Sequence, residues 1–163
     1  MTLDRDAPDT IDWRALPGQA LRLSLLEMAL VLVAWAALLM SAGALAALPF
    51  RWLAKLFGKH AGAISYIPIV NAAQFHNARL VQQAIRRAAR LSPFRSDCLR
   101  QALAGATLCR LMRVPAAVHL GVKHEPDGTF AAHAMLHVGP VSVSGGNGFD
   151  KFAIISCFVR LGD

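Results

Sequence analysis

The sequence predicts an α+β fold, in which N-terminal helices precede one further helix packed on an antiparallel sheet. Small and apolar side chains recur at helical spacing over residues 98–113. After Pro115 the apolar side chains instead alternate with a period of two, which is typical of strands. Turn signals at Pro126-Asp127-Gly128 and Gly139-Pro140 separate the alternating runs, as expected of an antiparallel meander.

Composition limits the class of protein. The chain has 163 residues, of which 55% are hydrophobic and 17% are charged, so it is too apolar for a disordered protein. Its length suits one domain of roughly 100–150 residues with an appendage. Three cysteines are too few, and odd in number, for a secreted module held together by disulfides.

The net charge of +7 is unevenly placed along the chain. No Asp or Glu occurs between residues 28 and 96, whereas the same stretch holds eight Lys and Arg residues. Such a region faces either water or a negative partner, such as an acidic peptide, anionic lipid headgroups, nucleic acid or an acidic protein. Nucleic acid is not expected, because no stacking aromatics interleave with the basic residues and no binding motif occurs.

Residues 1–23 form a predicted polar N-terminal tail, and residues 24–94 a helical segment. Residues 28–50 carry no charge, and an apolar run of this length is sufficient to cross a bilayer. A membrane span would place Arg51 and the C-terminal part in the cytoplasm. A helix buried on nearly all sides of a soluble protein is the second interpretation. A signal peptide cleaved near Ala42-Gly43-Ala44 is disfavoured, because the segment starts late and follows four aspartates.

The rest of the helical segment is basic. Residues 51–57 predict a short amphipathic helix that ends at Gly58, and residues 62–71 a loop or turn. Residues 72–91 predict a longer helix with apolar side chains toward a core and four arginines outward, ended by Pro93.

Residues 95–163 form the predicted C-terminal core. Its helix runs from about Cys98 to Arg113, with Ser96 or Asp97 as the N-cap. The small side chains along one face of this helix permit a close approach to a sheet. The predicted strands are 117–122, 130–138, 141–144 and 152–159.

Cys98 lies in the first turn of this helix, where unpaired N–H groups and the helix dipole favour an anion. We therefore expect a lowered thiol pKa and a nucleophilic cysteine, with a small buried hydrophobe as the alternative. Cys109 and Cys157 lie in apolar surroundings and are expected to be inert. His133 lies in the middle of a strand between two alanines, and histidine suits proton transfer with a thiol near pH 7. A purely structural histidine is the alternative there.

No metal ion, nucleotide or other cofactor is predicted. His133 and His137 lie about 13 Å apart on one strand, at 3.3 Å per residue, which is too far for one zinc ion. His119, His124 and Cys98 would meet only through an unforeseen tertiary arrangement. No C-x-x-C, H-E-x-x-H or phosphate-binding loop motif occurs.

A set of short motifs resembles the lasso-peptide B protein family, which consists of transglutaminase-like cysteine proteases that remove the leader from a lasso precursor. The resemblance covers about Ser24 to Val159 and implies a transglutaminase/papain-like core. The motifs that carry it are Ser96-Asp97-Cys98-Leu99, Val114-Pro115-Ala116, Leu120-Gly121-Val122, Ala132-His133-Ala134 and the upstream Leu48-Pro49-Phe50-Arg51.

The resemblance implies roles for individual residues. Cys98 would be the nucleophile, His133 the base, and a thioester intermediate would be hydrolysed by water. The backbone N–H of Cys98 would help to stabilise the oxyanion. The family places an orienting Asp on the strand after the histidine strand, and residues 141–144 contain no acid. Asn147 and Asp150 are the candidates for that third role.

The resemblance also implies partners. No strand hairpin is predicted before Arg95, which corresponds to the split form of the family that lacks its own leader-recognition domain. A separate leader-recognition protein, the leader of a lasso precursor and an ATP-dependent lactam synthetase are therefore the expected partners, in the cytoplasm, with membrane association through residues 28–50 left open. An acyltransferase that uses the same Cys–His pair, and a non-catalytic membrane-associated adaptor, are the alternative functions.

Overall fold

The computed structural model describes residues 24–93, 97–146 and 149–162 and confirms the predicted α+β class. The elements follow one another in the order α2 Leu25–Ala47, α3 Phe50–Phe57, β1 Lys59–Gly62, α4 Ala72–Leu91, α5 Cys98–Leu111, β2 Ala116–His124, β3 Phe130–Val138, β4 Val141–Ser144, the 3₁₀ helix η1 Phe149–Lys151 and β5 Ala153–Arg160.

The strands form one antiparallel sheet in the order β1-β5-β2-β3-β4. Two features differ from the predicted meander. The last strand, β5, returns to pair with β2 instead of β4, and the unpredicted strand β1 adds to the far edge of β5. β1 has only four residues and no alternating pattern, so it is a strand because β5 offers it backbone partners.

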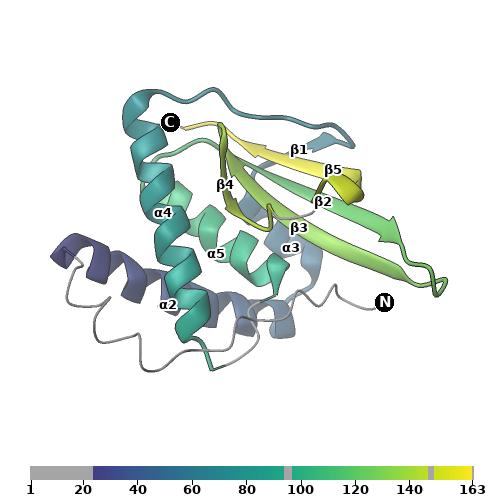
Figure 1. The fold of residues 1–163 in the computed structure, drawn as a ribbon, viewed down its shortest axis with the longest axis horizontal. Coiled ribbons are helices and arrows are strands. Elements are labelled where there is room, and N and C mark those ends of the chain that lie inside the picture. The colour runs from purple at the N-terminus through teal and green to yellow at the C-terminus, as the bar shows by residue number, and fades with distance from the viewer. Residues whose placement is uncertain (1–23, 94–96, 147–148, 163) are drawn as a thin grey trace.

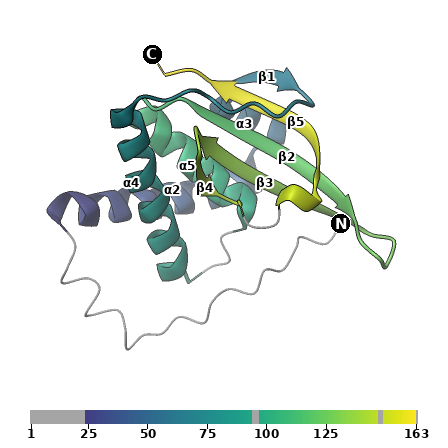
Figure 2. The same cartoon turned by 45° about the horizontal axis from the view of Figure 1, so that its top comes forward.

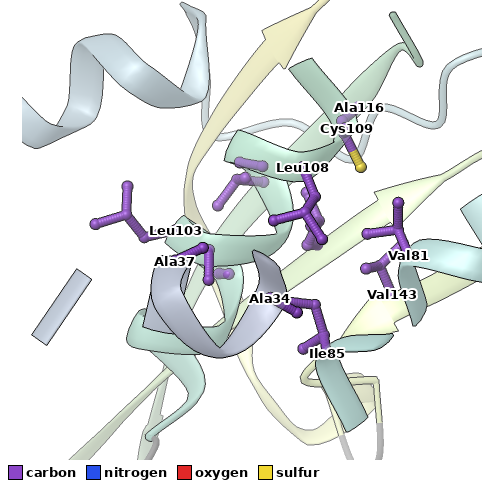
Figure 3. Packing of buried hydrophobic residues seen from close by; sticks show 14 of the residues in the cluster. Ala34, Ala37, Val81, Ile85, Leu103, Leu108, Cys109, Ala116 and Val143 are labelled. Carbon is purple, nitrogen blue, oxygen red and sulfur yellow. The ribbon is translucent and has the colours of Figure 1, made fainter. Parts of the chain in front are cut away.

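The helices cover one face of this sheet (Figure 1). α5 packs on β3, β4 and β2, while α4 lies beside it against β4, and α2 packs on α4 and α5. Figure 3 shows where the layers meet, with Ala34 of α2, Ile85 of α4, Leu108 of α5 and Val143 of β4 in one cluster.

The small residues of α5 allow the predicted close approach to the sheet. A Cβ added to Gly105 would lie 2.6 Å from Cδ2 of Leu136 on β3 and 3.4 Å from Cγ1 of Val143 on β4. Ala102 and Cys109, on the same helix face, are fully buried. The helix that begins with Cys98 is therefore held tightly against the strand that carries His133.

α2 is a well-capped helix that is buried along one stripe only. The Ser24 side chain accepts the backbone N–H of Glu27, and the Glu27 carboxylate accepts the backbone N–H of Ser24 in return. Ala34 and Leu38 lie in the core, whereas Leu25 and Leu32 on other sides are exposed. Among the described residues, α2 alone is long and apolar enough to cross a membrane, but it is not buried on nearly all sides.

The other face of the sheet is covered by the segment between β1 and α4 and by η1 (Figure 2). The backbone N–H of Tyr66 donates to Nε2 of His119 on β2 at 3.1 Å, which fastens this segment to the sheet. Val70 packs at the β3–β4 turn, where a Cβ on Gly139 would approach Cγ2 of Val70 to 2.6 Å.

Candidate active site

Cys98 is the first residue of α5 and is half-buried. The Asp97 side chain caps the helix by accepting the backbone N–H of Arg100 at 2.9 Å. Asp97 is thus the cap, while Ser96, the other candidate, lies outside the described residues.

The Cys98 sulfur accepts a hydrogen bond from the backbone N–H of Ala134, the residue that follows His133 on β3. Burial raises the pKa of the Cys98 thiol, and the Asp97 carboxylate raises it further, whereas the N–H groups of Ala134, Leu99 and Cys98 itself lower it. The direction is opposite to the lowered pKa expected from the helix start. Loss of water around the sulfur outweighs the N–H groups, so this cysteine is a neutral thiol at pH 7.

His133 projects from β3 on the side of the sheet that η1 covers. Its ring stacks on Phe152, with centroids 5.1 Å apart and planes 28° from parallel, and lies 5.9 Å from the ring of Phe149. Gly121, directly opposite on β2, makes room for these rings, because a Cβ there would lie 2.8 Å from Cβ of Phe152. The aromatic rings therefore fix the plane of the imidazole.

The Nε2 atom of His133 lies 2.8 Å from the carbonyl oxygen of Gly145. A carbonyl only accepts hydrogen bonds, so Nε2 carries the proton and donates. In the neutral ring, Nδ1 is then left with a free lone pair. This hydrogen bond selects the tautomer in which Nδ1 can act as a base.

Gly145 can hold its carbonyl in this position because it has no side chain. Its φ is +67°, in the left-handed region, and a Cβ would collide with the carbonyl oxygen of Ala134 and lie 3.2 Å from Nε2 of His133. β4 ends one residue earlier, at Ser144, whose partner on β3 is Leu136. β3 therefore continues past the end of β4, and the groups around His133 gather at this open edge.

The structure describes one of the two candidates for the residue that orients His133. Asn147 lies outside the described residues. Asp150 is exposed on η1, next to Phe149, whose ring contacts His133. In the described part of the chain the His133 ring donates to the Gly145 carbonyl, so a carboxylate role for Asp150 stays a prediction.

The remaining cysteines are buried, and burial raises their pKa values, to about 12 for Cys109. His119 and the half-buried His137 have ring centroids 5.8 Å apart, and we call them the buried histidine pair because the Nδ1 atoms of both rings are buried. Burial lowers the pKa of both histidines, and His137 lowers that of His119 further. Within the described ranges, no group of three or more His, Cys, Asp or Glu residues is arranged to hold a metal ion.

Sequence reasoning missed the groups that act through the backbone. The N–H of Ala134 and the carbonyl of Gly145 carry no side-chain signal, because every residue except proline has both groups. The positive φ and the close approach of that glycine could be expected only once β3 and β4 were placed side by side.

A model of the transglutaminase-like superfamily matches residues 44–157, which is more than half of the chain and includes Cys98, His133 and Gly145. The chain belongs to the transglutaminase-like superfamily. No curated protein and no solved structure matches it significantly. The superfamily contains both cysteine proteases and acyltransferases, so membership supports thiol-based acyl chemistry without selecting the acceptor.

The superfamily match begins within α2 and includes α3 and α4 as well as the predicted core from residue 95. These helices pack on the Cys98 helix and on the sheet, so they belong to the same folded unit as the candidate site.

Proposed function

We propose that this protein is a cysteine peptidase that removes the leader from a lasso peptide precursor, with Cys98 as nucleophile and His133 as base. The observation that carries the proposal is that the Cys98 sulfur contacts the backbone N–H of Ala134, the residue that follows His133 in the sequence. The Nε2 proton of His133 is held by the Gly145 carbonyl. Superfamily membership supports the same chemistry.

The raised pKa of Cys98 determines how the nucleophile is generated. A neutral thiol must lose its proton as it attacks, and Nδ1 of His133 has the free lone pair to take it. The imidazolium that forms keeps its Nε2–H donated to the Gly145 carbonyl, so Nδ1 is the atom that exchanges the proton. In this mechanism a backbone carbonyl does the work that an Asp or Asn does in related sites.

The attack forms a bond between the sulfur and the peptide carbonyl carbon. The oxyanion lies at the start of α5, where the N–H groups of Cys98 and Leu99 point out of the helix and can stabilise it. The C–N bond then breaks, the imidazolium donates its proton to the departing amine, and a thioester remains on Cys98. Water, deprotonated by His133, hydrolyses the thioester to a free carboxylic acid.

The substrate class comes from the motifs around Cys98 and His133 that resemble the lasso-peptide B proteins. We accordingly propose that a separate leader-recognition protein delivers the precursor and that a lactam synthetase uses the freed amine. The basic surface of α4, which includes exposed Arg79 and Arg86, offers such a partner or an acidic leader a complementary charge.

The experiment is cleavage of a lasso precursor by the full chain with its leader-recognition protein, followed by mass spectrometry. Cys98→Ala is expected to abolish cleavage and keep the fold, whereas Cys109→Ala, on the same helix, is expected to retain activity. Full cleavage by Cys98→Ala would overturn the proposal. A leader product carrying an amide instead of a free acid would show an acyltransferase, because only the acceptor of the thioester differs.

A further inference from the structure

The side of α2 that does not pack on the protein is apolar throughout. Between Glu27 and Arg51 the helix has no charged residue, and Leu25, Leu32, Leu39 and Met40 are exposed. A helix that borders water on one side normally carries polar residues there. We therefore expect this surface to contact an apolar partner, because a contiguous exposed apolar patch usually marks an interaction site.

α3 extends this surface and adds positive charge. Trp52 is exposed beside Arg51 and Lys55, and Nζ of Lys55 lies 4.9 Å above the Trp52 ring. Leu53, on the opposite side of the helix, is buried against the core. Aromatic and basic residues together on a short amphipathic helix suit the boundary between lipid headgroups and acyl chains. We call one set of exposed apolar residues on α2 and α3 the docking face, which comprises Leu25, Leu32, Leu39, Met40 and Trp52.

The positive charge of this region indicates that its binding partner is negatively charged. Residues 28–96 contain no Asp or Glu, and Arg51, Lys55 and Lys59 adjoin the docking face on α3 and β1. All three side chains belong to exposed residues. A basic cluster next to an apolar surface favours anionic headgroups.

The packing of α2 excludes the transmembrane orientation that its length alone would permit. Ala34 and Leu38 are fully buried where α2 packs on α4 and α5, and Glu27 pairs with Arg87 of α4 at 3.5 Å. If α2 crossed the hydrocarbon core, α4 and its arginines would have to enter it as well, which is unfavourable. A helix embedded in a folded domain along one side can reach lipid only with its outer side.

We propose that α2 and α3 attach the folded domain to an anionic membrane surface, with both helices lying in the plane of the bilayer and the docking face in contact with the acyl chains. The attachment is peripheral and reversible. It rests on the docking face and its charge, and it does not depend on the peptidase proposed above.

The test is sedimentation of the full chain with vesicles. We expect binding to vesicles with 30% phosphatidylglycerol, weak binding to pure phosphatidylcholine, and release by high salt or alkaline carbonate, since a peripheral protein is released where a spanning protein is not. Replacement of Lys55 by Gln is expected to weaken binding about fivefold, as one headgroup-facing cation contributes about this factor.

Leu32→Glu is the decisive variant, and Leu111→Glu is its matched control. The two leucines are 69% and 68% exposed, but Leu111 lies at the end of α5, away from the docking face. A glutamate at position 32 would have to enter the headgroup boundary, so we expect at least a tenfold loss of vesicle binding. The control is expected to bind as the wild type does, and both variants are expected to keep the wild-type circular dichroism.

Three results would overturn the proposal. Equal vesicle binding by Leu32→Glu and the wild type would show that the docking face does not contact the membrane. Resistance of the bound protein to alkaline carbonate would indicate a spanning helix. Absence of vesicle binding together with a wild-type dimer that Leu32→Glu dissociates would show that a second copy covers the face. Cleavage of the precursor in solution is measured separately, so failure of either proposal leaves the other testable.

Discussion

The contact between Gly105 and Leu136 sets how closely the Cys98 helix approaches the His133 strand, and a double-mutant cycle can measure it. An alanine at position 105 gains about 1 kcal/mol of helix propensity. Its Cβ would lie 2.6 Å from Cδ2 of Leu136, which is fully buried. Because such overpacking costs about 1–3 kcal/mol, we expect Gly105→Ala to lower the free energy of unfolding by about 1 kcal/mol.

The second variant removes the obstacle. Leu136→Ala deletes a fully buried side chain and is expected to cost about 2–5 kcal/mol. In that background the new Cβ at position 105 meets no Cδ2 atom, so Gly105→Ala should stabilise by about 1 kcal/mol. The sign of the Gly105→Ala effect therefore reverses, which corresponds to a coupling energy of about 2 kcal/mol.

The assay is urea unfolding at pH 8, followed by circular dichroism, for the wild type, the two single variants and the double variant. A stabilising Gly105→Ala in the wild-type background, or additivity of the two changes, would refute the packing argument. In the precursor-cleavage assay, Gly105→Ala should lose more activity than its stability change explains, because pushing α5 away from β3 moves Cys98 away from His133.

Three further predictions follow from the site. Gly145→Ala should lower kcat for precursor cleavage about 10- to 150-fold, since a hydrogen bond to a charged ring contributes about 1.5–3 kcal/mol. Gly128→Ala is the control, because Gly128 also has a positive φ but has open space around it, and this variant should leave kcat unchanged. Asp97→Ser and Asp97→Ala should both lower the pKa of Cys98, measured by the pH dependence of thiol alkylation, because both remove the carboxylate charge. Only Asp97→Ala also removes the helix cap, so only this variant should lose about 1 kcal/mol of stability. An unchanged alkylation midpoint in both variants would contradict the charge effect. The lowered pKa values of the buried histidine pair mean that the folded state binds fewer protons than the unfolded state. The free energy of unfolding should therefore be constant above about pH 6.5 and fall below it, and the fall should be smaller in His119→Gln. A free energy of unfolding that is independent of pH between 8 and 5 would be the contrary result.

Local patterns in the sequence determined the elements that carry the candidate chemistry. Helical spacing of small residues predicted α5, an alternating pattern predicted β2 and β3, and a short oxygen side chain before Cys98 predicted the cap. Each of these signals lies within a few residues of the feature it predicts. The α+β class and the first position of Cys98 on its helix could therefore be predicted without coordinates.

Only the tertiary structure decided the pairing of β5 with β2, the direction of the Cys98 pKa and the group that orients His133. Each of these depends on residues that are distant in sequence. Burial of the thiol arises from packing against β3, and the Gly145 carbonyl reaches His133 because the chain turns where β4 ends. A carbonyl and an N–H are present in nearly every residue, so the fold alone determines which of them face the imidazole and the sulfur.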